Sequence, residues 1–450
     1  MERRLYVFAA SAFIVAAVLA SAWITGQFTT PAVDRTDGFV SELAARDQPW
    51  TRLFRVSDGL SGLACALGVA LVPRVAREWQ GWLALTGFGL FTIVTGLFPL
   101  DCATLSDPVC SDRDLSIGHH VHTVAGMLAT AAILAAMTLL SARWRSWVSW
   151  LFTGLSVVAT TLTLAALAAG HGAGIAHRAQ LTMIAVWLVY VALRLLVDDG
   201  DHSRGDGVPH VVEQGRGPTV LITSGTAGAW FHWDAVARSL SRTHRVVRFD
   251  RPGLGLSPGL TAPPTLYAEA ARLAALAPAH PARVTVVAHG VACWHAEAFA
   301  RLHPLCVAKL VLVNPVCAAE RRPLALARSA AQWLPALGGT WAATAVARLA
   351  GPAVHRIVTG EPDPYGVYRM GKVPAAAVGE WLARRDMAAD LGRLREGTPF
   401  PQAQVTVISS GEKGACRERL AGDLGARLVR LPQAGRQVQS TAPEAVADAV

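Results

Sequence analysis

The chain has 450 residues, of which 52% are hydrophobic and only 16% are charged. This composition excludes a disordered or fibrous protein, and it is too apolar for an ordinary soluble enzyme. The net charge of +9 is unevenly placed, because residues 1–200 carry 13 basic and 13 acidic side chains whereas residues 201–450 carry 28 and 19. We therefore expect lipid to surround the first half and water to surround the second.

Six apolar stretches follow one another in the first half, most of them near the roughly 20 residues that a helix needs to cross a bilayer. The first stretch ends in Ala20-Ser21-Ala22, which resembles a signal-cleavage site, but its apolar core is long and five more stretches follow. We expect it to be retained and predict a six-span membrane domain over residues 1–197. The stretches lie at about 5–25, 57–73, 82–99, 119–140, 147–168 and 178–197.

The orientation follows from the basic residues of the short loops, which favour the cytoplasmic side. The loop after the third stretch is acidic, and basic side chains gather on the other side of the predicted membrane. We therefore predict a bacterial plasma-membrane protein with both termini in the cytoplasm, where the basic second half would face anionic lipid headgroups. Since arginine supplies 38 of the 41 basic residues, this charge also fits a GC-rich genome. The loop arginines are Arg3, Arg4, Arg74, Arg77, Arg143 and Arg145.

The cysteines agree with this topology. Cys102 and Cys110 share the predicted outer loop and are candidates for a disulfide in an oxidising compartment. The cysteines of the second half show no metal-binding CxxC spacing. We expect them to be reduced, buried thiols: Cys293, Cys306, Cys317 and Cys416.

One polar constellation lies at the predicted outer boundary of the membrane. His119 and His122 are three residues apart and share a helix face, and His171 and Asp101 fall at the same level. Imidazole and carboxylate groups of this kind could hold a metal ion, so the four residues form a candidate metal site. The alternative is that they are structural side chains at span ends, where headgroup water is available.

The segments "TGLFPLDCA … GHHVHTVAGM" and "GIAHRAQLTMIAVWLVYVALRLL" resemble a bacterial six-helix membrane family known only as a domain of unknown function, family 998. The resemblance covers about residues 5–197 and depends on the Phe-Pro-x-Asp end of the third span, the histidines after it and Arg178. It implies the six-span topology and no assigned chemistry.

After a polar, glycine-rich linker at 198–207, the pattern changes to short Val- and Ile-rich runs alternating with amphipathic segments. The runs read "HVVEQG", "TVLITSG", "HRVVRFD", "RVTVVAH", "KLVLVNP", "QVTVISS" and "ARLVRLP", and they predict strands. Helices are predicted at about 231–241, 264–277, 291–303, 415–424 and 442–450. This alternation predicts a mainly parallel sheet covered on both faces by helices.

The order of landmarks in residues 208–450 resembles the α/β-hydrolase fold. A strand ends at Ser224-Gly225, the next ends in "FDRPGLGLSPG", and a third ends in the sharp turn "AHGVA" at residues 288–292. A long helical insertion at about 316–400 lies where that fold usually carries its lid. The resemblance implies a multi-domain protein, with a six-helix membrane bundle followed by a cytoplasmic α/β-hydrolase-type domain with a helical lid.

The resemblance also locates the catalytic positions, and none of them carries a catalytic side chain. The nucleophile of the strand–turn–helix elbow would be Gly290, which has nothing to attack with. The acid position reads Gly414, with Glu412 two residues early, and the base position reads Arg436, which stays protonated. A standard Ser-His-Asp mechanism is therefore not expected. Glycine at the elbow fits the positive φ that such a turn requires.

We expect a membrane protein with an inactive hydrolase-like domain that binds a lipid or acyl ligand, senses it or acts as a scaffold. The alternative is an ester or lipid hydrolase that uses an unconventional nucleophile or a histidine metal site. We interpret Cys293 as a packing thiol. Apart from a metal ion at the outer histidines, no cofactor is predicted; the bilayer is the expected partner, nucleic acid is not, and the sequence identifies no protein partner. The candidate pocket residues are Ser224, Gly225, Thr226, His289, Gly290, Val291 and Arg436.

Overall fold

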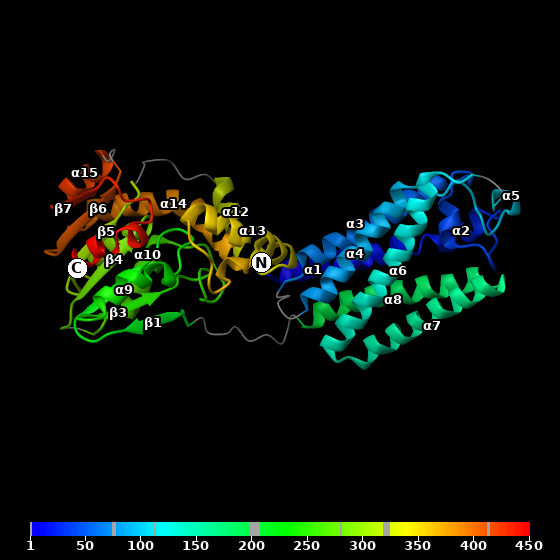
Figure 1. The fold of residues 1–450 in the computed structure, drawn as a ribbon, viewed down its shortest axis with the longest axis horizontal. Helices are drawn as coiled ribbons and strands as arrows, with labels where there is room; N and C mark the ends of the chain where they lie inside the picture. Colours follow the sequence, from blue (N-terminus) through cyan, green and yellow to red (C-terminus); the bar gives the residue numbers. More distant parts are fainter. Residues whose placement is uncertain are drawn as a thin grey trace. The chain divides into compact units, whose positions relative to one another are not determined.

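The computed structural model describes residues 2–73, 78–111, 114–198, 208–260, 262–279, 281–317, 325–411 and 415–450. The chain divides into two compact units at about residue 203, within the stretch expected to be a linker (Figure 1). Arg74, Arg77, Glu412 and Gly414, which the sequence singled out, lie outside the described residues.

The first unit is helical, and six of its helical stretches are long and apolar enough to cross a membrane, which confirms the predicted six-span architecture. Short elements, η1 (Val40–Ala44) and α5 (Pro108–Ser111), lie in the loops. The six stretches are α1 (Glu2–Ala20) with α2 (Trp23–Thr29), α3 (Thr51–Leu71), α4 (Trp79–Leu97), α6 (Ile117–Trp144), α7 (Trp147–Ala169) and α8 (Ala173–Asp198).

The core of this unit is formed by large apolar side chains together with glycines at a close helix contact. Phe13, Trp82 and Trp187 are almost completely buried. A Cβ atom at Gly89 of α4 would lie 2.7 Å from the carbonyl oxygen of Gly62 of α3, so these two helices approach at a distance that only glycine permits.

The second unit contains one seven-stranded sheet with strand order β1-β3-β2-β4-β5-β6-β7, parallel except for β1, as the sequence pattern predicts. Alternate side chains of each strand enter two different cores, as the twofold period of a strand requires. Val286 faces one core and Val287 the other. The strands are β1 (Val211–Gln214), β2 (Thr219–Thr223), β3 (Arg245–Phe249), β4 (Val284–His289), β5 (Val307–Val313), β6 (Gln404–Ser410) and β7 (Arg427–Leu431).

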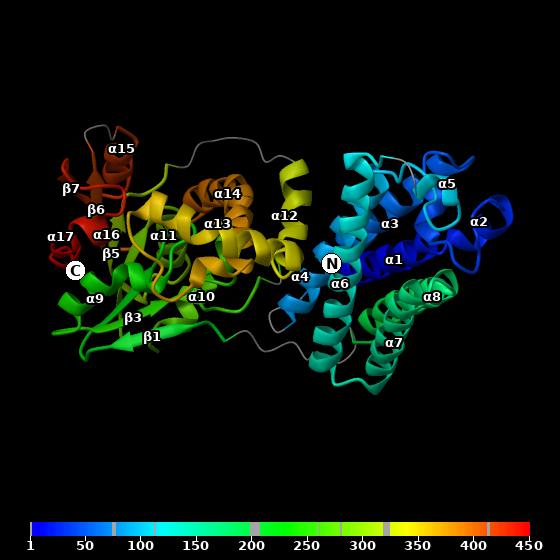
Figure 2. The ribbon, with the colours of Figure 1, turned by 45° about the vertical axis from the view of Figure 1, so that its right-hand side comes forward.

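Helices cover both faces of the sheet (Figure 1, Figure 2). One core lies beneath α10 (Leu266–Leu276), α11 (Ala292–Leu302) and α14 (Lys372–Gly397). The other lies beneath η2 (Trp230–Trp233), α9 (Asp234–Leu240), α16 (Val438–Thr441) and α17 (Pro443–Ala447). The remaining helix, α15 (Ala415–Asp423), joins β6 to β7.

Between β5 and β6 the chain forms the helical insertion that the sequence predicts. It consists of α12 (Ala325–Leu337), α13 (Trp341–Thr359), the short η3 (Val367–Arg369) and α14. Tyr368 of η3 donates a hydrogen bond from its hydroxyl to the carbonyl oxygen of Ala227, 2.6 Å away in the loop after β2. The insertion is therefore attached to the edge of the sheet where the parallel strands end.

Candidate functional site

The outer histidines of the membrane unit, which the sequence offered as a candidate metal site, do not converge in this structure. His119 Nδ1 accepts a hydrogen bond from the main-chain N–H of Asp101, while His122 Nδ1 lies 3.0 and 2.8 Å from two main-chain carbonyl oxygens at the end of α4. His171 instead contacts Asp37 at 3.3 Å. Within the described ranges, no three His, Cys, Asp or Glu side chains are placed to share a metal ion. The Nδ1 atom of each imidazole has a different local partner.

Asp101 also has a local role. Its carboxylate accepts hydrogen bonds from the main-chain N–H of Ser116 at 2.6 Å and from the Ser116 hydroxyl at 2.9 Å, and it lies 3.4 Å from Arg46. These hydrogen bonds, more than the nearby arginine, hold the pKa of Asp101 below its usual value. The carboxylate therefore fixes the loop that leads into α6.

Arg178, which contributes to the resemblance to family 998, holds another loop of this unit. Its Nη1 donates to the carbonyl oxygens of Arg35, Gly38 and Gly174 at 2.8 to 3.0 Å. The adjacent His177 accepts a hydrogen bond from the main-chain N–H of Val40. This arginine therefore satisfies carbonyl oxygens of the segment between α2 and α3 and holds that segment against α8.

The structure contains two cysteine pairs. Cys102 and Cys110 form a disulfide, with their Cα atoms 5.9 Å apart. Cys317 and Cys416 are also placed as a pair, with Cα atoms 6.2 Å apart, and Cys317 is exposed, so the expectation of separate, buried thiols is wrong for these two. The sequence missed this pair because 99 residues separate the cysteines, and only the sheet brings the ends of β5 and β6 together.

The elbow between β4 and α11 has the backbone geometry of a nucleophile turn. Gly290 has φ +59°, in the left-handed region that favours glycine. Its N–H donates to the carbonyl oxygen of Val313 on the neighbouring strand at 3.0 Å. A Cβ atom at this position would meet only the Cα of Gly225, at 3.7 Å. A side chain at 290 would therefore project toward the loop after β2, although the chain carries none.

The loop after β2 faces the elbow, and Ser224, Gly225 and Thr226 lie in it. Ser224 is buried, and its hydroxyl donates to the Ala229 carbonyl oxygen while accepting from the indole N–H of Trp233. It is therefore a structural turn residue. Thr226 is exposed, and neither its main-chain N–H nor that of Val291 has a hydrogen-bond partner among the described residues. Main-chain N–H groups at these two places are where the fold binds a negatively charged oxygen.

A buried ion pair that sequence reasoning missed supports this loop. Arg251, from the Asp-Arg-Pro-Gly run, donates from Nη1 to the Ser224 carbonyl oxygen and from Nη2 to that of Gly225. The same guanidinium pairs with Glu380 of α14 at 2.5 Å, with both side chains at most 5% exposed. The sequence placed Arg251 in the run after β3 without assigning it a role, and nothing in the sequence of the insertion identified Glu380 as its partner.

The base position lies against the elbow, as the resemblance implies, but through its backbone. The carbonyl oxygen of Arg436 accepts hydrogen bonds from His289 Nε2 at 3.2 Å and from the Asn314 side-chain amide at 3.0 Å. The Arg436 side chain is exposed. Burial lowers the pKa of His289 to about 4, so the ring is neutral at pH 7 and its proton is on Nε2. His289 therefore joins the end of β4 to the loop that contains Arg436. It does not act as a general base for residue 290, which is a glycine.

Cys293, the nearest thiol, is a poor substitute nucleophile. It is buried in the first turn of α11, and its Sγ lies 3.3 Å from the carbonyl oxygen of Ala288. Burial raises its pKa, which disfavours the reactive thiolate. The interpretation as a packing thiol agrees with this placement.

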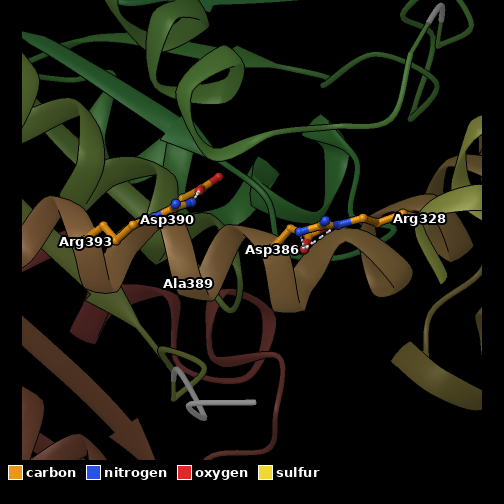
Figure 3. Close-up of a pocket in the computed structure, with 5 residues that line it drawn as sticks. All are labelled: Arg328, Asp386, Ala389, Asp390 and Arg393. Atoms are coloured by element: carbon orange, nitrogen blue, oxygen red, sulfur yellow. Dashed lines mark hydrogen bonds and ion pairs between the residues drawn. The ribbon is translucent and has the colours of Figure 1, made fainter. Parts of the chain in front are cut away.

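A surface hollow of about 290 Å³ lies on the helical insertion (Figure 3). It is lined by Arg328 of α12, which pairs with Asp386 of α14 at 2.9 Å, and by Asp390 and Arg393, which pair with each other within α14. The side chains that line it are already paired with one another, so we do not assign it a ligand.

The sheet order, the elbow and the loop facing it define residues 208–450 as a domain of α/β-hydrolase type. Residues 218–394 match the family described as "alpha/beta hydrolase fold". Residues 13–194 match the family described as "Protein of unknown function (DUF998)". The resemblance of each half to its family is therefore confirmed. No curated protein matches the chain.

Several solved structures are similar to the second half. Cfl2 from Burkholderia cenocepacia is 22% identical, and the match covers 53% of this chain and 90% of that one with a TM-score of 0.41. An alpha/beta hydrolase fold protein from Burkholderia ambifaria is 25% identical over 53% and 92%, with a TM-score of 0.40. The enol-lactonase from Burkholderia xenovorans LB400 is 19% identical over 53% and 94%, with a TM-score of 0.39. These similarities say nothing about what the present chain acts on.

Proposed function

We propose that this multi-pass membrane protein uses its α/β-hydrolase domain to bind an acyl or lipid ligand without hydrolysing it, as a sensor or scaffold at the inner membrane face. The observation that carries the proposal is Gly290, which keeps the elbow's φ of +59° but offers no nucleophile. An elbow that keeps its backbone conformation but lacks a nucleophile is best explained by a role in binding instead of catalysis.

The groups around the elbow support binding. The main-chain N–H groups of Thr226 and Val291 are without partners in the part of the chain that the structure describes, and they could donate to a carboxylate or ester oxygen. The exposed Arg436 guanidinium adds a cation near the same edge for an anionic headgroup. Arg436 cannot serve as a general base because it stays protonated.

We place both termini in the cytoplasm of a bacterium, on the evidence of the loop arginines. Three spans, α6, α7 and α8, separate the Cys102–Cys110 loop from the hydrolase domain. If all three cross, the pairs Cys102–Cys110 and Cys317–Cys416 lie on opposite sides of the membrane. In this orientation the second pair faces the reducing cytosol.

A binding experiment tests the proposal. We expect full-length protein in detergent to bind a fluorescent medium-chain fatty acid saturably, and Gly290→Trp to weaken that binding at least about tenfold, or about 1.4 kcal/mol. Gly425→Trp is the matched control for backbone strain, because Gly425 has φ +57° and open space around it, in the turn before β7. Equal affinity in both variants, or measurable ester turnover by the wild type, would overturn the proposal.

The alternative, an ester or lipid hydrolase with an unconventional nucleophile or a histidine metal site, has less support. Cys293 is buried with a raised pKa, and His119, His122 and His171 contact separate partners. We propose no resident cofactor. The bilayer is the proposed partner.

A further inference from the structure

Helix α13 of the insertion exposes large apolar side chains along one face. Leu349 is 86% exposed and Ile357 is 84% exposed, and Val346, Val354 and Val358 are each more than half exposed. Of these, Val346, Leu349, Val354 and Ile357, here called the α13 apolar face, lie within about 140° of one another around the helix axis at 3.6 residues per turn, which places them on one side of the helix. A contiguous exposed apolar surface on a folded domain marks an interaction site.

The opposite side of α13 fixes the direction in which this face points. Ala347 and His355 are buried, and the His355 ring stacks on Tyr368 with ring centroids 4.0 Å apart. Gly351 packs so closely on the Tyr368 main chain that no Cβ would fit there. Since this side is packed on the rest of the insertion, the α13 apolar face points away from it and is exposed among the described residues of its domain.

Helix α12 presents a further apolar side chain. Leu326 is 87% exposed. Two residues later Arg328 pairs with Asp386 of α14, which holds α12 in place (Figure 3). Leu326 is therefore exposed although α12 is itself packed on α14.

The charge of α13 favours an anionic partner. Between Trp341 and Thr359 the helix has no acidic residue, and the exposed Arg356 lies at one edge of the α13 apolar face. An amphipathic helix with apolar side chains on one face and arginines beside them binds in the interfacial layer of a bilayer with its axis in the membrane plane. Each arginine near an anionic surface contributes to this attraction.

We propose that the α13 apolar face docks onto the bilayer in which the chain's own spans lie, inserting Leu349 and Ile357 among the lipid headgroups. The segment of residues 198–207, which connects α8 to the hydrolase domain, can extend no further than about 35 Å. Because this connection keeps the domain close to the bilayer, the membrane is always available as a partner of the α13 apolar face. This docking goes beyond the proposed function, since it requires no ligand at the elbow.

Fluorescence quenching in the reconstituted full-length protein tests the docking. A solvatochromic probe is attached at Leu349→Cys in a Cys306→Ser background, in vesicles containing phosphatidylglycerol and nitroxide-labelled lipid. Leu305→Cys in the same background is the matched control, because Leu305 is a 62% exposed leucine of the same domain outside the insertion. We expect quenching at least about threefold stronger at position 349 than at position 305. Equal quenching at the two positions, or shielding at 349 only after another protein is added, would overturn the proposal.

Two further variants separate the apolar and electrostatic contributions. Leu349→Asp with Ile357→Asp, probed at Val346→Cys, should lose the quenching, while Leu305→Asp should leave it unchanged; all three replaced side chains are more than 60% exposed, so folding should be preserved. Arg356→Glu should lower quenching in phosphatidylglycerol to its level in phosphatidylcholine. Undiminished quenching in the aspartate double variant contradicts the docking. None of these readouts depends on fatty-acid binding at Gly290, so the docking and the proposed function can fail separately.

Discussion

The two candidate sites that the sequence proposes, the outer histidines and the elbow, differ in what determines their geometry. His119 and His122 are three residues apart on α6, yet their rings bond to different neighbours, and His171 bonds to a third. At the elbow, by contrast, the position of Gly290 is fixed by the end of β4 and by the turn into α11, opposite the loop after β2. Helical spacing brings side chains to one face, whereas a sheet edge brings separate loops to one point.

The comparison also shows where polar groups find their partners. In the membrane unit, His119, His122 and Asp101 each contact a partner in a neighbouring loop or helix end. In the α/β unit, the N–H groups of Thr226 and Val291 have no partner among the described residues, although the loop and elbow that hold them are firmly supported. Donors held in place without a partner are characteristic of a binding site.

The largest expected effect comes from breaking the buried Arg251–Glu380 pair, which supports the loop after β2 beside the elbow. Glu380→Ala leaves Arg251 buried without its carboxylate, which should cost about 3–5 kcal/mol of unfolding free energy. Glu418→Ala is the matched control: its pair with Arg430 has a similar distance, 2.6 Å, but is exposed, and it should cost about 0–1 kcal/mol. Urea unfolding of full-length protein in detergent, followed by hydrogen exchange in α11, measures both. Equal losses would show that the buried pair is not what supports the loop.

A smaller effect concerns His295 of α11, whose two ring nitrogens have no hydrogen-bond partner. Burial lowers its pKa well below the usual value, so the unfolded chain binds the proton more tightly than the folded one. Stability should therefore be complete above pH 6.5 and fall as the pH decreases, by at most about 2 kcal/mol at pH 5. His295→Leu should reduce that loss. A thermal-unfolding series from pH 7.5 to 5 checks this, and an unchanged slope in the variant would contradict it.

The smallest expected effect is at the outer histidines. His122→Ala removes the ring that bonds to two carbonyl oxygens at the end of α4, which should cost about 1 kcal/mol of stability without changing metal content. Elemental analysis of the purified protein and its thermal unfolding with and without chelator measure the two quantities. Stoichiometric zinc or iron in the wild type that is lost in His122→Ala would show that the outer histidines bind a metal, and would contradict the contrast drawn here between the two candidate sites.

Much of the fold could be predicted from the sequence, because apolar length and strand–helix alternation are local signals. The six spans, the parallel sheet and the helical insertion all follow from such signals, and the turn context led to Gly290, which has the positive φ expected there. What could not be predicted depends on contacts between distant segments. The pairing of Arg251 with Glu380 joins residues 129 positions apart, and that of Cys317 with Cys416 joins residues 99 apart.

The most direct test of an elbow that binds without catalysing is ester hydrolysis by full-length protein in detergent, using nitrophenyl esters of short to medium chain length. We predict no turnover above buffer, with or without chelator, and no difference between the wild type and Cys293→Ala. Turnover that Cys293→Ala abolishes would identify a substitute nucleophile, and turnover that chelator abolishes would move the chemistry to a metal. Either result would contradict the conclusion that Gly290 marks a binding site.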